Sequence, residues 1–264
     1  MLRNLTRRRE LIWQLSLREM QGKYRGSYLG MIWALVTPLL TLMVYTFVFH
    51  FVFHAHWTDQ PDENFMVYAM NMFSGIIAFN VFSESTVRAP LLIVQNMNFV
   101  KKVVFPLEVL PVSVVAAAVM HSLLALVILV VGAACGAGPL HWTLVLLPIV
   151  FLPLIMFTTG ICWILSSLGV FLRDLGNVVQ VVVQLLFFAT PVTYPLTRIG
   201  DPRIRLAMLI NPLTSMVVNF HRVTNEGLPP ELGSYSYSLA AGALAAIVGY
   251  AWFMKIKRAF ADVI

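Results

Sequence analysis

Long apolar segments with no Asp or Glu away from their ends dominate this sequence and restrict the folds open to it. A helix that crosses about 30 Å of hydrocarbon needs roughly 20 apolar residues. The sequence predicts six such spans, at residues 31–53, 65–83, 107–131, 144–170, 175–194 and 236–254. Charged residues make up only 11% of the chain, against about 25% in soluble domains. We therefore expect an all-α membrane protein with a single transmembrane domain over residues 1–264.

The distribution of Lys and Arg predicts how these spans are oriented. If both termini are cytoplasmic, the cytoplasmic segments hold fourteen of the 18 Lys and Arg residues, in agreement with the positive-inside rule. The loop at residues 55–64 then faces outward, and it contains three acidic residues and no basic ones. The net charge of +6 follows from the basic cytoplasmic segments. We expect contact with membrane lipids and no nucleic-acid partner.

Residues 1–30 precede the first span and are predicted to form a cytoplasmic amphipathic helix. Leu11, Ile12, Trp13 and Leu15 give this segment a broad apolar face between arginines, which is typical of a helix lying on a membrane surface. The alternative is a frayed basic tail. A cleaved signal peptide is not expected, because the apolar run that follows is about 23 residues long and a signal peptide has 7–15.

The fifth predicted span breaks off within FFATPVTYPLTRIGDPRIRLAMLINPL (Phe187–Leu213). Proline lacks an N–H and disfavours helix at the residue before it, so the helix should stop near Thr190. Residues 191–225 are too interrupted to cross, and we predict a re-entrant helical hairpin between spans five and six that acts as an outer gate. The expected gate residues are Pro191, Tyr194 and Pro195. The alternative is a surface loop with one amphipathic helix on the outer leaflet.

Two stripes of polar and aromatic residues mark a possible conduit. Buried amides are costly in hydrocarbon unless they meet partners or water, and helical spacing places the members of each stripe on related faces. The stripe in the fifth span is Asn177, Gln180 and Gln184, and the stripe in the first span is Trp33, Thr37, Thr41 and Tyr45. A glycan pathway would use such neutral groups. Hydrogen bonding between packed helices explains them equally well.

The sequence lacks the residues that several classes of function require. The chain contains no G-x-x-x-x-G-K-[ST] nucleotide-binding motif, so we expect it to bind no cofactor. The spans lack the carboxylates that a membrane glycosyl or acyl transferase or an ion-driven carrier would use. His50, His54 and His56 are close in sequence but are expected to be interfacial side chains without metal. His121 is expected to be hydrogen-bonded and structural.

Four segments resemble the type-2 ABC exporter permeases that export cell-surface polysaccharide. They are KYRGSYLGMIWALVTPLLTLMVYTFVF (Lys23–Phe49), FLRDLGNV (Phe171–Val178), TPVTYPL (Thr190–Leu196) and NPLTSMVVNFHRV (Asn211–Val223). Thr37 stands where this family more often has asparagine. The resemblance implies a transport subunit and not an enzyme, in the bacterial inner membrane. It also implies a homodimer and two copies of a separate cytoplasmic ABC ATPase that binds ATP and Mg²⁺. The expected substrate is a lipid-linked glycan of the O-antigen, capsule or teichoic acid type, with a drug or free lipid as the alternative.

The resemblance also implies that a cytoplasmic loop at residues 84–106 receives the ATPase, together with the N-terminal helix. The short apolar run in this loop would suit a partner's groove. The residues expected to contact the ATPase are Leu91, Leu92, Phe99, Lys101 and Lys102, with Arg173 and Asp174 as a secondary contact. The alternative for the two lysines is that they only mark the cytoplasmic side.

Overall fold

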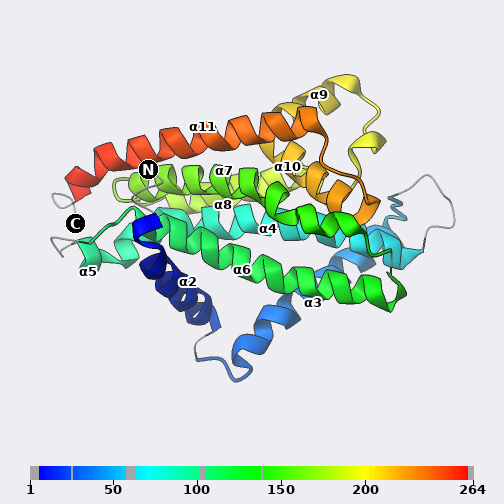
Figure 1. Cartoon of the computed structure of the whole chain (residues 1–264), viewed down its shortest axis with the longest axis horizontal. Helices are drawn as coiled ribbons and strands as arrows, with labels where there is room; N and C mark the ends of the chain where they lie inside the picture. Colours follow the sequence, from blue (N-terminus) through cyan, green and yellow to red (C-terminus); the bar gives the residue numbers. More distant parts are fainter. Residues whose placement is uncertain (1–5, 25, 58–63, 101–104, 138, 261–264) are drawn as a thin grey trace.

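The computed structural model describes residues 6–24, 26–57, 64–100, 105–137 and 139–260, and all regular structure in these ranges is helical. The longer helices lie side by side along one axis, and α2 begins at the same end of the bundle at which α11 ends (Figure 1). The elements in chain order are α2 (Arg9–Tyr24), η1 (Gly30–Ile32), α3 (Trp33–Thr46), η2 (Phe47–Val52), α4 (Phe65–Gln95), α5 (Met97–Val100), α6 (Val109–Gly132), η3 (Ala133–Ala137), η4 (Trp142–Leu146), α7 (Leu147–Leu168), α8 (Leu175–Phe188), η5 (Leu196–Arg198), α9 (Pro202–Ile210), α10 (Pro212–His221), η6 (Arg222–Glu226), α11 (Leu232–Ile256) and η7 (Lys257–Ala259).

Within the described ranges, five helical segments are long and apolar enough to cross a membrane, which confirms an all-α membrane protein. They are Gly30–Val52, Phe65–Gln95, Val109–Cys135, Trp142–Leu168 and Leu232–Ala259. The sixth predicted span forms only the 14-residue helix α8, which is about 21 Å long at 1.5 Å per residue. A six-span count therefore remains a prediction.

The end of α8 shows why that span is short. The helix ends at Phe188, before Pro191 and short of the predicted boundary at Tyr194. The hydroxyl of Tyr194 donates a hydrogen bond to the carbonyl of Phe188. This bond satisfies one of the carbonyl groups that a helix leaves without a partner at its C-terminus.

Helix α4 is the central element of the bundle, and it corrects one prediction from sequence. It packs against α6, α7, α8 and α10 and contributes a large share of the buried side chains. The helix continues past Ser83 to Gln95, through the first half of the segment 84–106 that sequence predicts to be a loop. Burial of Ala89 and Ile93 against the rest of the chain stabilises this extension despite Pro90.

Helices α7 and α11 approach each other backbone to backbone at glycines. A Cβ atom on Gly160 would lie 2.3 Å from the carbonyl oxygen of Ala245, and one on Gly249 would lie 2.2 Å from the carbonyl oxygen of Gly160. A Cβ on Gly242 would lie 2.6 Å from the carbonyl oxygen of Pro153. Small residues at helix contacts allow this close packing in membranes.

The segment between α8 and α11 contains two short helices with different environments. Helix α10 packs against α11, α4 and α7, and Leu213, Val217 and Phe220 are buried in the main core. Helix α9 is exposed except at Met208. The predicted outer segment therefore does contain two helices, whereas its depth in the membrane remains a prediction.

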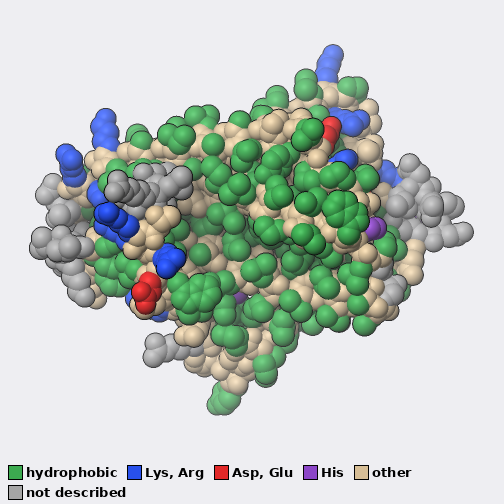
Figure 2. Space-filling model, viewed as in Figure 1, with side chains coloured by type: hydrophobic (Ala, Val, Ile, Leu, Met, Phe, Trp, Pro, Cys, Tyr) green, Lys and Arg blue, Asp and Glu red, His purple; other side chains and the backbone are tan. Residues whose placement is uncertain are grey.

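Ion pairs join three elements at the end of the bundle where α2 begins. Arg8 Nη1 lies 2.9 Å from Glu108 Oε1, and Lys257 Nζ lies 3.2 Å from Glu108 Oε2. Burial alone would raise the pKa of Glu108. A backbone hydrogen bond together with Arg8 and Lys257 outweighs burial and holds the pKa below its ordinary value. Figure 2 shows Lys and Arg side chains gathered at this end and near α9, with mostly apolar side chains on the surface between.

Within the predicted segment 1–30, residues Arg9–Tyr24 form helix α2, and part of its apolar face packs on protein. Leu15 is buried in a cluster with Leu92, Leu110 and Phe260, and Leu11 and Ile12 pack against that cluster. Trp13 is exposed. The position of α2 on the cytoplasmic leaflet therefore remains a prediction. Trp13, rather than the buried Leu15, is the side chain that would contact the lipid.

Candidate functional site

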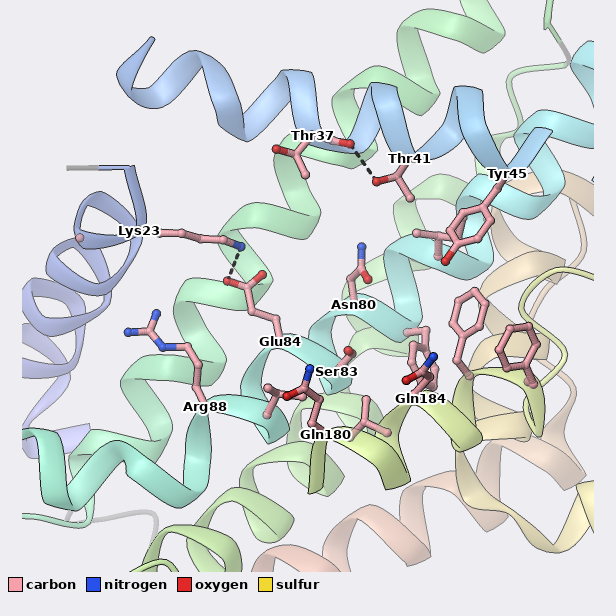
Figure 3. Close-up of a pocket in the computed structure, with 17 residues that line it drawn as sticks. Lys23, Thr37, Thr41, Tyr45, Asn80, Ser83, Glu84, Arg88, Gln180 and Gln184 are labelled. Atoms are coloured by element: carbon pink, nitrogen blue, oxygen red, sulfur yellow. Dashed lines mark hydrogen bonds and ion pairs between the residues drawn. The ribbon is translucent and has the colours of Figure 1, made fainter. Parts of the chain in front are cut away.

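A pocket of about 910 Å³ lies between α2, α3, α4 and α8 (Figure 3). Five of the seven predicted conduit residues line it, so the structure brings most of the two stripes together. These five are Thr37, Thr41, Tyr45, Gln180 and Gln184. Trp33 is half-buried and Asn177 is exposed, and neither lines the pocket.

Helix α8 positions the two glutamines on one face. Gln180 and Gln184 are four residues apart and are therefore neighbours on the helix surface. Val179 and Val183 are buried in the main core and anchor this helix against the bundle. Within the described part of the chain, neither glutamine side chain is hydrogen-bonded. Both amides are available to a ligand.

Helix α3 supplies hydroxyl groups and an aromatic ring. The hydroxyl of Thr41 donates to the carbonyl of Thr37 over 2.9 Å, and its lone pairs remain available as acceptors. The ring of Tyr45 stacks on Phe187 of α8, with centroids 5.7 Å apart. This stacking joins the α3 stripe to α8 through Phe187, which lies outside the predicted α8 stripe but lines the same pocket.

Helix α4 supplies pocket residues that sequence reasoning missed. Asn80, Ser83 and Glu84 line the pocket at a spacing of three and four residues, so they share one helix face. Figure 3 shows Asn80 between the α3 threonines and the α8 glutamines. The available signal was the polar pair Asn80 and Ser83 near the end of a predicted span that also contains Asn71 and Ser74.

Charged groups meet at the α2 end of the pocket. Lys23 Nζ lies 3.0 Å from Glu84 Oε1, and His121 Nδ1 lies 2.8 Å from the same oxygen. Arg88 lines the pocket and pairs with Glu19 of α2. His121 is hydrogen-bonded, as expected, and its structural role remains a prediction. A smaller cavity of about 80 Å³ adjoins this end and shares Lys23 and Glu84.

The predicted outer-gate residues lie directly after α8 and are held by hydrogen bonds. Pro191 is buried, whereas Tyr194 and Pro195 are half-buried. The side-chain amide of Asn211 donates to Thr190 Oγ1 over 3.1 Å, and the hydroxyl of Tyr68 donates to the carbonyl of Thr193 over 3.0 Å. The segment is therefore fixed to α4 and α10 in this state.

The predicted ATPase-contact residues have mixed environments. Leu91, Arg173 and Asp174 are exposed, and Lys101 and Lys102 lie outside the described residues. Leu92 is only 2% exposed and packs inside the chain. Its predicted direct contact with a partner is therefore wrong for this state, because α4 continues as helix and turns this side chain inward. Phe99 stacks on Phe105 with centroids 4.3 Å apart.

The pocket combines amides, hydroxyls and aromatic rings along its length with charge only at one end. Such walls suit a neutral ligand with many hydroxyl groups, because amides and hydroxyls both donate and accept hydrogen bonds. Among the described residues, no three His, Cys, Asp or Glu side chains come together as a metal site.

Residues 10–223 match the model of the family described as ABC-2 type transporter. The chain is 36% identical over 171 residues to the O-antigen export system permease protein RfbA of Myxococcus xanthus, a match that covers 64% of this chain and 65% of that protein. It is 32% identical over 200 residues to a protein of the same name from Klebsiella pneumoniae, covering 75% of this chain and 76% of that protein. A second protein of that name from Klebsiella pneumoniae is 29% identical over 200 residues, with the same coverage.

Proposed function

The chain belongs to the ABC-2 type transporter family, and we propose that it is the permease subunit of an exporter for O-antigen-type polysaccharide. The single observation that carries this proposal is the polar and aromatic pocket on a chain of this family. The residues assigned to the glycan are Thr37, Thr41, Tyr45, Gln180 and Gln184, together with Asn80 and Ser83. We propose a lipid-linked form of the glycan as the transported species.

A homodimer is the proposed assembly because one chain leaves α3 and α8 largely uncovered. Only 11% of the most apolar stretch of the first span is buried inside the chain. On α8, many of the exposed side chains are apolar, among them Val181 at 57% and Leu185 at 64% exposed. Apolar faces can contact lipid without cost, whereas an amide that faces lipid without a hydrogen-bond partner is unfavourable. A second copy that packs against α3 and α8 would shield the glutamine face from lipid and complete the conduit.

The proposed topology has six membrane crossings with both termini in the cytoplasm of a bacterial cell, in its inner membrane. Helix α8 and the segment that follows it would form the fifth crossing, with α9 and α10 as the outer hairpin and gate. The charged end of the bundle would face two copies of a separate ATPase that binds ATP and Mg²⁺. The proposed contacts are α2, Leu91, Phe99, Lys101, Lys102, Arg173 and Asp174.

Deletion of the gene in its native host tests the substrate. We expect lipid-linked polysaccharide to accumulate on the cytoplasmic side and to disappear from the cell surface, because synthesis continues without export. Restoring the wild-type chain should reverse both effects. A deletion strain with normal surface polysaccharide and an altered drug or lipid distribution would contradict the proposal and favour a different cargo.

A further inference from the structure

Helix α9 presents apolar side chains on the side that faces away from the protein. Eight of its nine residues are exposed, and only Met208 is buried. At about 100° per residue, Leu206 and Ile210 lie opposite Met208, and they are 62% and 67% exposed. Such a ridge is unfavourable in water because it keeps two large aliphatic side chains hydrated.

Arginines border this apolar ridge. Arg203 is three residues before Leu206, and Arg205 is four residues before Leu209, so each is next to an apolar side chain on the helix surface. Residues 198–205 contain three arginines and a single acidic residue, Asp201. The carboxylate of Asp201 accepts a hydrogen bond from the backbone N–H of Arg203 over 2.8 Å and so caps the helix. Figure 2 shows Lys and Arg among apolar side chains in this region.

We propose that α9 binds the headgroups of anionic phospholipids. The ridge of Leu206 and Ile210 would enter the acyl boundary, while Arg203 and Arg205 extend to the phosphates. Guanidinium groups bind phosphate oxygens in a bidentate manner, and the aliphatic part of the arginine side chain can lie along an apolar surface. Each basic residue near an anionic membrane surface strengthens the attraction to that surface about fivefold. This inference rests only on α9 lying at the membrane surface and is independent of the transported substrate.

The test measures which lipid surrounds α9 in the full-length chain. Cys135, which is exposed, is replaced by Ser, and Ala207→Cys is labelled with a fluorophore one turn after Arg203. The protein is placed in bilayers of phosphatidylcholine and phosphatidylglycerol, with a spin-label quencher carried on one lipid or the other. We expect several-fold stronger quenching by the phosphatidylglycerol quencher. We expect R203Q/R205Q to remove this preference, because both phosphate-binding groups are then lost.

The matched control is K255Q/R258Q, which removes the same charge at the opposite end of the bundle and should keep the preference. Equal quenching by the two lipids in the unsubstituted chain overturns the proposal, and so does a preference that survives in R203Q/R205Q. Absence of quenching by either lipid also overturns it, because α9 would then be covered by protein. An unsubstituted chain that shows the lipid preference but exports no glycan would speak against the transport role alone.

Discussion

Gln180 and Gln184 illustrate how single residues determine what the pocket can bind. Their amides line the same pocket as Thr41 and Tyr45, and they form no hydrogen bond with any residue that the structure describes. An amide both donates and accepts hydrogen bonds and carries no charge, so it can exchange successive hydroxyl groups of a sliding chain. A carboxylate at the same position would accept only, and it would repel an anionic carrier.

The substitution Gln184→Leu should reduce polysaccharide export about fivefold, because one hydrogen bond contributes about 1 kcal/mol. The measurement is the rate at which labelled polysaccharide reaches the surface of cells with equal amounts of permease in the membrane. Asn177→Leu is the matched control on the same helix, and since Asn177 does not line the pocket, export should be unchanged. Full export by the Gln184→Leu variant would show that this amide serves only helix packing.

Glu108 makes stability depend on pH at the junction of α2, α6 and α11. Its pKa is lowered in the folded chain, so the unfolded chain binds more protons. The stabilisation is therefore complete above about pH 4.3, the ordinary glutamate pKa, and is lost as the pH falls through the lower pKa of the folded state.

We expect Glu108→Gln to cost on the order of 1–2 kcal/mol at neutral pH, since Arg8 and Lys257 are partly exposed. We also expect this variant to weaken the drop in thermal midpoint between neutral pH and about pH 3, because the loss occurs below about pH 4.3. Thermal unfolding in detergent at several pH values checks both statements. Glu226→Gln, at an exposed position, should follow the wild-type curve. An identical pH profile for Glu108→Gln would rule out the assigned role of this carboxylate.

At the scale of elements, the spans were predictable and their contacts were not. Hydrocarbon demands about 20 apolar residues for a crossing, so length and composition identified α3, α4, α6, α7 and α11 directly. The extension of α4 beyond Ser83 was missed because Glu84 and Arg88 read as the end of a span. In the structure, these two side chains form ion pairs with residues of α2.

The meeting of α3 and α8 depends on how each helix is rotated, and periodicity alone does not fix rotation between two helices. Sequence therefore identified Thr41 and Gln184 as stripe residues but could not show that they share a pocket. The same reasoning explains why Asn80 was missed. An isolated polar residue in an apolar span has the same sequence signature whether it lines a cavity or bonds to a neighbouring helix.

The glycine contact between α7 and α11 gives a test at this scale. Gly160→Ala should lower stability by about 1–3 kcal/mol or more, because the added methyl group overlaps the backbone at Ala245 and the helices must separate. The measurement is the thermal midpoint of the purified protein. Gly233→Ala is the control, since a Cβ there meets no atom within 4 Å. An unchanged midpoint for Gly160→Ala would mean that the two helices are not packed this closely.

At the scale of the whole molecule, the pocket lies beside surfaces that a single chain leaves uncovered. The apolar, exposed side of α8 and the uncovered first span lie next to the pocket, whereas α11 packs against α7 and α10. The proposed dimer would therefore join copies through α3 and α8 and leave α11 in contact with lipid.

Cross-linking between copies tests this arrangement. In a Cys135→Ser background, Leu185→Cys on α8 should form cross-linked dimers with a short bifunctional thiol reagent in membranes. Leu244→Cys on α11 is exposed to the same extent, at 64%, and should remain monomeric on denaturing gels. Cross-linking of Leu244→Cys without Leu185→Cys would place the interface on the opposite side of the chain.

The shared position of the start of α2 and the end of α11 has a practical consequence (Figure 1). Two copies could be fused in tandem through a linker that never has to traverse the bilayer. Such a fusion would separate two effects that one gene cannot separate, because any substitution in a symmetric assembly changes both halves at once. A tandem protein with one altered half would reveal whether export requires the pocket residues of both copies or of only one.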